Sequence, residues 1–231
     1  MPQFDIGLVL SGQYHGWLLA GLRVSLQLAA MALAIALPLG LAVALLRLAP
    51  LAPLRALGWL YVESIRNVPL LAHLLFWYFG VPALLPEGVR DTLQQGNTEL
   101  LCAVIGLALY TGAYMAEDVR SGIRAVPPGQ LDAARALGFG FLGAMRLVVL
   151  PQAIRITVPP LLSRTLSLWK DTSIATVIGA GEMMYQAARV ESATFRSAEA
   201  FVFTTSAYLA VSLALTAAAT VFEHRYPVRR A

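Results

Sequence analysis

The sequence is poor in charged residues. Of its 231 residues only 13% are Asp, Glu, Lys or Arg, about half the share of an ordinary globular protein, whereas 58% are hydrophobic. So few charges cannot cover the surface of a soluble domain of this size, and a disordered chain would need low hydrophobicity and high charge. The composition excludes both classes and predicts a polytopic membrane protein with roughly five or six helices.

Other absences limit the chemistry of the chain. The one cysteine, Cys102, lies in an apolar run, which excludes a disulfide framework and a cysteine-based metal site. Lys170 is the only lysine and does not lie in a Gly-x4-Gly-Lys-Ser/Thr loop that would hold the phosphates of ATP. His15, His73 and His224 are scattered, and we expect them to be structural. The chain is therefore expected to be no enzyme and to hold no metal or cofactor of its own.

Five stretches are long and apolar enough to cross a bilayer. They cover about residues 24–46, 57–79, 100–115, 154–178 and 201–222. Polar residues interrupt the second and the fourth stretch. The segment before the first lacks a positive n-region, so we expect this span to be retained as an anchor. The predicted fold is all-α, with about five transmembrane helices in one domain over residues 1–231 and a membrane core at about 17–222.

The arginines predict how the chain lies in the membrane. If the amino terminus is outside, the cytoplasmic segments carry ten arginines and the outer segments carry three. The ten are Arg47, Arg55, Arg120, Arg124, Arg135, Arg146, Arg155, Arg225, Arg229 and Arg230, and the three are Arg90, Arg189 and Arg196. Because short cytoplasmic loops are rich in Lys and Arg, we expect the amino terminus outside and the carboxyl terminus in the cytoplasm. The net charge of +4 is not gathered on a soluble face, so nucleic acid is not an expected partner.

The segment between the third and fourth spans, about 118–152, is longer than a simple connection requires. Residues 130–137 are mainly helix formers that follow a proline pair, Gly138 and Gly140 interrupt them, and a second apolar stretch ends at Pro151. The pattern predicts a helix, a glycine turn, a second helix and a proline stop. Leu131, Ala134 and Leu137 fall on one face, and Asp132 is expected in the first turn. Such a hairpin could rest on the membrane interface or dock a cytoplasmic partner.

This segment resembles the EAA loop, E-A-A-x3-G-x9-I-x-L-P, of ABC importer permeases. Asp132 stands where that family usually has Glu, and Val148 where it usually has Ile. The positions that match the motif and would couple to an ATPase are Asp132, Ala133, Ala134, Gly138, Leu150 and Pro151. Further runs resemble the polar amino-acid subfamily of these permeases: residues 61–70, 122–126 with 129–130, 150–155 and 170–174. Residues 66–70, 81–87 and 174–179 look most like a glutamate/aspartate importer permease.

The resemblance implies a complete set of partners and a location. It implies the type I ABC importer fold, two cytoplasmic ATPase subunits that bind ATP and Mg, a second permease subunit, and an extracytoplasmic amino-acid-binding protein. The second permease could be identical or a homologue, and the glutamate/aspartate resemblance favours a heterodimer. The expected location is the bacterial inner membrane, in contact with lipid. The cytoplasmic position that the arginine count gives to the loop agrees with docking to an ATPase.

Polar side chains inside the second span mark a candidate translocation path. An ionised group at bilayer depth is costly and normally faces a partner, a cavity or a pathway. Glu63, Arg66 and Asn67 share one helix face, because they lie at positions i, i+3 and i+4. They could form a self-contained Glu–Arg pair, or line a path beside a local break at Pro69.

The third and fourth spans carry similar polar faces. Ser163, Ser167 and Lys170 form one stripe, and Arg164 and Asp171 lie on the adjoining face. Lys170 could be neutralised by Asp171 or could receive a substrate carboxylate.

Tyr110, Tyr114 and Glu117 share a face of the third span, where they could serve helix packing or line the path. The expected function is alternating-access import of a polar, acidic amino acid. The alternatives are glutamine, arginine or histidine as substrate, or a secondary transporter that works alone.

Overall fold

The chain folds into a bundle of long helices. The computed structural model describes residues 5–225, and this range contains helices and turns but no strand. Within it, four helical segments are long and apolar enough to cross a membrane: α2 (Gly12–Leu48), α7 (Thr98–Arg124), the continuous stretch Phe141–Ile178 and α12 (Ser197–Arg225). The all-α fold predicted from the composition is confirmed.

Shorter elements connect these segments. They are α1 (Gly7–Leu10), α3 (Ala52–Arg66), α4 (Leu70–Leu75), the π-helix η1 (Phe76–Gly80), α5 (Val81–Leu84), α6 (Glu87–Gln94), α8 (Pro128–Ala136), α9 (Phe141–Ala144), the π-helix η2 (Met145–Val149), α10 (Leu150–Asp171), the 3₁₀-helix η3 (Thr172–Ile178) and α11 (Met183–Thr194).

The second predicted span, residues 57–79, is a broken helix and not a continuous one. Ala52–Arg66 and Leu70–Leu84 meet at an angle of 102°. The break lies where Val68 precedes Pro69, because a residue before proline is disfavoured in the helical region. Two carbonyls that the break releases find partners: His73 Nε2 lies 3.0 Å from the Ile65 oxygen, and the Tyr114 hydroxyl donates to the Arg66 oxygen at 3.5 Å. Irregular backbone at membrane depth is tolerated under this condition.

The helices around the predicted loop 118–152 run further than the sequence pattern indicated. Helix α7 continues to Arg124, and Glu117 lies within it, on the third span where the polar face was predicted. Pro151 does not stop the second short helix, because the chain runs through η2 into α10 and Pro151 lies in the first turn of α10. Pro151 has no N–H to donate to the preceding turn, and a π-helix such as η2 directly before it is a local adjustment that lets a helix continue past a proline.

Helix α7 forms the centre of the bundle, and α12 lies at its edge. The most apolar window of α7 is 61% buried, against 11% for α12. Small residues let α2 approach α7: a Cβ on Gly40 would lie 2.8 Å from the Met115 Cβ and 3.1 Å from the Gly112 oxygen. Ala32 and Ala36 on the same face of α2 are fully buried. Lipid tails are as apolar as the helices, so such close backbone packing is what holds membrane helices together.

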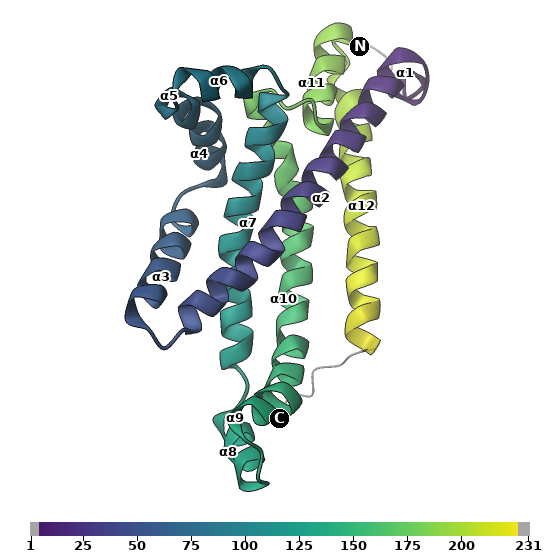
Figure 1. Cartoon of the computed structure of the whole chain (residues 1–231). Coiled ribbons are helices and arrows are strands. Elements are labelled where there is room, and N and C mark those ends of the chain that lie inside the picture. Colours follow the sequence, from purple (N-terminus) through teal and green to yellow (C-terminus); the bar gives the residue numbers. More distant parts are fainter. Residues whose placement is uncertain (1–4, 226–231) are drawn as a thin grey trace.

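The two ends of the bundle differ. Helices α8 and α9 project at one end, and α1, α6 and α11 lie at the opposite end (Figure 1). The end of α2, the start of α3 and the end of α7 point toward the α8–α9 end, and these segments carry four of the ten arginines predicted to be cytoplasmic. Arg229 and Arg230 lie outside the described residues. The side of the membrane on which each end lies stays a prediction.

We expect that replacing Gly122 with alanine destabilises the protein through the contact of α7 with α10. The added Cβ would overlap Thr157 Oγ1 and lie 3.1 Å from the Thr157 Cβ. Overpacking of this kind costs about 1–3 kcal/mol, and 1 kcal/mol lowers the melting temperature of a chain of this size by about 2–4 °C. Thermal unfolding in detergent measures the effect. Gly129→Ala is the matched control, since nothing lies within 4 Å of the position of its Cβ. Equal melting temperatures for the two variants would contradict the prediction.

Candidate functional sites at an exposed hairpin and a polar cluster

The glycine turn of the predicted hairpin exists and has a defined geometry. Gly138 adopts φ +88°, which L side chains rarely adopt. Its N–H donates to the Arg135 oxygen at 2.9 Å, and the Phe139 N–H donates to the Ala134 oxygen at 3.1 Å. These two bonds form a Schellman motif, which ends α8 and turns the chain toward α9. Glycine is required here because of the left-handed backbone conformation.

Beyond this turn the hairpin presents apolar side chains to the outside. Leu137 is 79% exposed, Leu142 80% and Phe141 58%. The other side of the hairpin packs on the start of the fourth span, where Leu131 contacts a buried cluster of Val126, Val149 and Ala153. The prediction that Leu137 shares one face of the first short helix with Leu131 and Ala134 is wrong, because α8 ends at Ala136 and Leu137 is exposed whereas Ala134 is buried.

The six residues that match the EAA motif occupy both sides of the hairpin. Asp132, Ala133 and Gly138 are exposed, and so are Leu150 and Pro151 at the start of α10, whereas Ala134 is buried. Asp132 lies just after the first turn of α8 and not within it, because the helix begins at Pro128. The exposed members are accessible to another subunit.

A polar cluster lies between the second, third and fourth spans, around Tyr114. The guanidinium carbon of Arg66, at the end of α3, lies 5.0 Å from the centre of the Tyr114 ring, and that of Arg164 in α10 lies 4.4 Å from it. The hydroxyls of Tyr110 and Tyr114 are 3.3 Å apart. The buried Nε of Arg66 has no hydrogen-bond partner among residues 5–225. Two cations therefore converge on one ring, and one of them keeps an unused donor.

Glu117 and Asp118 balance part of this positive charge. Glu117 forms ion pairs with Arg47 of α2 and with Arg120, one turn further along α7. Asp118 accepts from Arg164 Nε at 3.4 Å. The cluster thus ties α2, α7 and α10 together at the level of the helix break.

Within residues 5–225, the Tyr114 ring makes no aromatic or cation–π contact with five of the candidate path residues, Glu63, Asn67, Ser167, Lys170 and Asp171. Of these five, Asp171 interacts with a member of the cluster, Arg164. Glu63 accepts from Asn67 Nδ2 at 3.1 Å, and no Glu63–Arg66 ion pair forms within 4 Å, so the predicted self-contained pair is absent from the described residues. Asp171 interacts electrostatically with Arg164 and Lys170.

Ser167 donates to the Ser163 carbonyl at 3.2 Å, which satisfies its hydroxyl within α10. Lys170 is exposed, and no carboxylate in residues 5–225 lies within 4 Å of its ammonium group. Its cation is accessible from outside the subunit.

Four charged partners of the cluster were not among the predicted path residues. They are Arg47, Asp118, Arg120 and Arg164. Arg164 was placed on the adjoining face of its helix, but the helical spacing gave no indication of its contact with Tyr114. Since these residues come from three different spans, only the packing of the spans brings them together.

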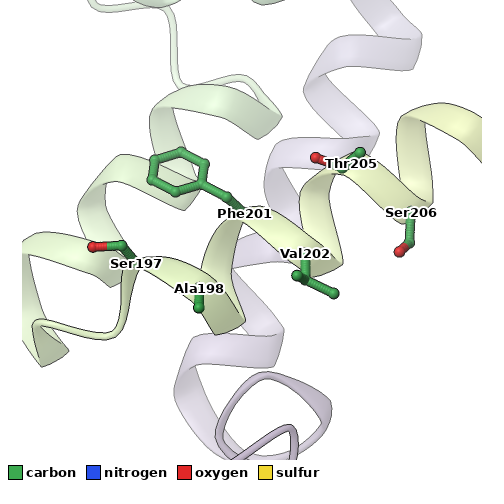
Figure 2. A pocket seen from close by; sticks show the side chains of 6 residues that line it. All are labelled: Ser197, Ala198, Phe201, Val202, Thr205 and Ser206. Carbon is green, nitrogen blue, oxygen red and sulfur yellow. The ribbon is translucent and has the colours of Figure 1, made fainter. Parts of the chain in front are cut away.

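A cavity along α12 is a poor candidate for a translocation site. It measures about 450 Å³ and is lined by Ser197, Ala198, Phe201, Val202, Thr205 and Ser206 (Figure 2). All six side chains come from one helix and none is charged. A groove on one peripheral helix cannot enclose a polar solute, since a binding site needs convergent groups from several elements.

Sequence reasoning also missed a buried carboxylate, Glu182, in the segment between η3 and α11. Its side chain is fully buried and caps α11 by accepting from the Tyr185 N–H at 2.8 Å. It also accepts from Ser25 of α2 at 3.2 Å and from Tyr208 of α12 at 2.9 Å. Glu182 therefore joins three helices. A glutamate just before a helix, close after two glycines, was the only signal in the sequence.

We expect Glu182 to make stability depend on pH. Burial raises the pKa of Glu182, so the fold favours its protonated form. The contribution of Glu182 to the free energy of unfolding is complete below the ordinary glutamate pKa. It is lost as the pH rises through the raised pKa. From pH 5 to pH 8 the melting temperature of the wild type should fall by about 2–4 °C more than that of Glu182→Gln, equivalent to about 1 kcal/mol.

Glu223→Gln is the control for this titration, because Glu223 is exposed near the end of α12. Its melting temperature should follow the wild type across the whole pH range. A Glu182→Gln variant with the same pH dependence as the wild type would contradict the assignment.

Comparison with known proteins identifies the family. Residues 24–227 match the family model described as binding-protein-dependent transport system inner membrane component. The chain belongs to this family. It is 37% identical to the probable glutamine ABC transporter permease protein GlnM of Bacillus subtilis, over 96% of this chain and 94% of that protein. It is 35% identical to the glutamate/aspartate import permease protein GltJ of Escherichia coli K12, over 92% of this chain and 88% of that protein.

A solved structure confirms the fold of this inner membrane component. A chain in the crystal structure of an amino acid ABC transporter with histidines superposes with a TM-score of 0.86 at 31% identity, covering 97% of this chain and all of that chain. The resemblance to ABC importer permeases is thus confirmed for nearly the whole length. The helix break, the α8–α9 hairpin and the polar cluster all lie within the matched region.

Proposed function

We propose that this chain is the permease subunit of an ATP-driven amino-acid importer and that its substrate is acidic. The relatives are permeases named for glutamine and for glutamate/aspartate, which supports an amino acid as cargo. The observation that carries the choice of an acidic substrate is the pair of guanidinium groups of Arg66 and Arg164 at the Tyr114 ring. The side-chain carboxylate of an acidic amino acid would take up the unused donor of Arg66 by a charge-assisted hydrogen bond.

The translocation path in this proposal follows the polar faces of the second to fourth spans. Its residues are Glu63, Arg66, Asn67, Tyr114, Glu117, Ser167, Lys170 and Asp171, together with Arg164. Lys170 would meet the carboxylate first, since it is exposed, and Arg66 and Arg164 would hold it at the helix break. The membrane core 17–222 and the hairpin within 118–152 form one domain. The path switches exposure between the two sides of the membrane.

The exposed hairpin would transmit movement from cytoplasmic ATPase subunits. Its apolar tip, Leu137, Phe141 and Leu142, is the kind of surface that a subunit interface covers. A dimer of ATPase subunits would bind the nucleotide and Mg, so this chain needs no cofactor. A second permease subunit, by preference a homologue, and an extracytoplasmic binding protein complete the importer in the bacterial inner membrane. The amino terminus would lie outside and the carboxyl terminus in the cytoplasm.

Reconstitution tests this function. The permeases and their ATPase, in proteoliposomes with the binding protein, should take up labelled glutamate only when ATP is present, and unlabelled aspartate should compete. Uptake by the purified chain alone, driven by an ion gradient, would contradict the importer assignment.

Glutamine is the second candidate substrate, because GlnM is a relative of comparable similarity. Competition by excess glutamine and not by aspartate would select glutamine over an acidic substrate. The same measurement leaves the importer assignment intact, so the two conclusions can be separated.

A further inference from the structure

Another cavity, which contains charged side chains, lies at the end of the bundle opposite the α8–α9 hairpin. It measures about 530 Å³ and lies among η1, α5, α6 and the start of α7 (Figure 1). Its lining consists of Tyr78, Phe79, Pro82, Ala83, Arg90, Leu93, Thr98 and Glu99. None of these residues belongs to the proposed path. The volume falls within the range of cavities that bind small molecules.

Two opposite charges line this cavity without pairing with each other. Arg90 comes from α6 and Glu99 from the first turn of α7, and no ion pair within 4 Å joins them. Arg90 forms an ion pair with Glu87 at 3.9 Å, and the Glu87 side chain is 90% exposed, so this contact contributes little. Glu99 accepts from the Tyr78 hydroxyl at 3.3 Å, a long hydrogen bond. Both charged groups keep most of their hydrogen-bonding capacity.

The remaining walls of the cavity are aromatic and apolar. The rings of Tyr78 and Phe79 pack edge to face with centroids 4.7 Å apart. Thr98 donates to the Leu93 carbonyl at 2.8 Å, which fixes the hydroxyl and closes the connection from α6 to α7. A ligand there would meet a cation, a carboxylate and apolar surface.

We propose that this cavity binds a zwitterionic amino acid before it enters the path between the spans. Arg90 would receive the α-carboxylate through its planar fork of donors, and Glu99 would receive the α-ammonium group. The aromatic walls would contact the carbon chain. A zwitterion satisfies both charges at once, whereas a simple anion or cation would leave one of them unmatched. This inference rests on the proposed function, which makes an amino acid the transported molecule.

Equilibrium binding to the assembled permease–ATPase complex tests the site. Labelled glutamate and labelled glutamine are added to the detergent-solubilised complex without binding protein and without ATP. We expect Arg90→Met and Glu99→Gln each to weaken binding of both amino acids to this cavity by about tenfold or more, because both share the zwitterionic backbone. Asp91→Asn is the matched control, since Asp91 is an exposed neighbour of Arg90 on α6 that does not line the cavity.

Arg66→Gln separates the two sites in the same assay. Binding to the cavity lined by Arg90 and Glu99 should persist in this variant, since Arg66 lies at the helix break and does not line that cavity. Wild-type binding that is lost in Arg66→Gln and unchanged in Arg90→Met would overturn the inference, because the path would then be the only site. Absence of amino-acid binding by a wild-type complex that transports normally would also overturn it. Failure of ATP-driven uptake in proteoliposomes would instead refute the proposed function.

Discussion

Replacing Gly138 with valine is expected to lower ATP-driven uptake by at least about tenfold while leaving the membrane-spanning helices folded. Gly138 has φ +88°, and a β-branched residue is strongly disfavoured there. Left-handed backbone costs a non-glycine residue about 1–2 kcal/mol, and 1.4 kcal/mol corresponds to a tenfold change in an equilibrium constant. The two hydrogen bonds of the Schellman turn would break, and the α8–α9 hairpin would lose the shape that we propose for docking.

Gly140→Val provides a matched control two residues away. Gly140 has φ −65° and ψ 166°, which valine adopts readily, and a Cβ added at either Gly140 or Gly138 would have no neighbour within 4 Å. The two variants therefore add the same side chain in open space and differ in backbone strain. Co-purification with the ATPase subunit and uptake in proteoliposomes should be lost in Gly138→Val and retained in Gly140→Val. Equal behaviour of the two variants would show that the turn geometry is not needed for coupling.

Replacing Arg66 with glutamine is expected to reduce glutamate uptake by about tenfold or more. A hydrogen bond to a charged group contributes about 1.5–3 kcal/mol, and 1.4 kcal/mol corresponds to a factor of ten. The effect on glutamine uptake should be less than about threefold, because the side chain of glutamine carries no charge for Arg66 to stabilise. Initial uptake rates of the two amino acids, measured in the same proteoliposomes, give the ratio.

Two further variants define the role of the charge. Arg66→Lys keeps the cation and should retain part of the preference for glutamate. Arg124→Gln removes an exposed arginine at the end of α7 and should change neither rate. Gel filtration and assembly with the ATPase establish that each variant is folded. An equal loss of glutamate and glutamine uptake in Arg66→Gln would assign Arg66 to the helix break alone and not to the substrate.

Local sequence patterns predicted most of the architecture. The apolar runs located four of the spans, and the Val68–Pro69 pair located the break in the remaining one. Gly138 and the EAA spacing located the hairpin turn. These features depend on residues close together in the chain, so backbone preference and hydropathy are enough to place them. Helix α7 continues to Arg124, past residue 118, because its polar residues find partners there, as Glu117 does with Arg47. The predicted proline stop at Pro151 was wrong, because η2 carries the helix through it.

The composition and spacing of the chain thus determined that it is a membrane protein, about how many times it crosses, and which segment is expected to couple it to a partner. Only the tertiary structure decided which charges meet. Tyr114 lies beside Arg66 and Arg164, Glu182 joins α2, α11 and α12, and Arg90 faces the same cavity as Glu99. The physical reason is that helical periodicity fixes the face on which a side chain lies, whereas the rotation and depth of each helix depend on the small residues that pack it against its neighbours.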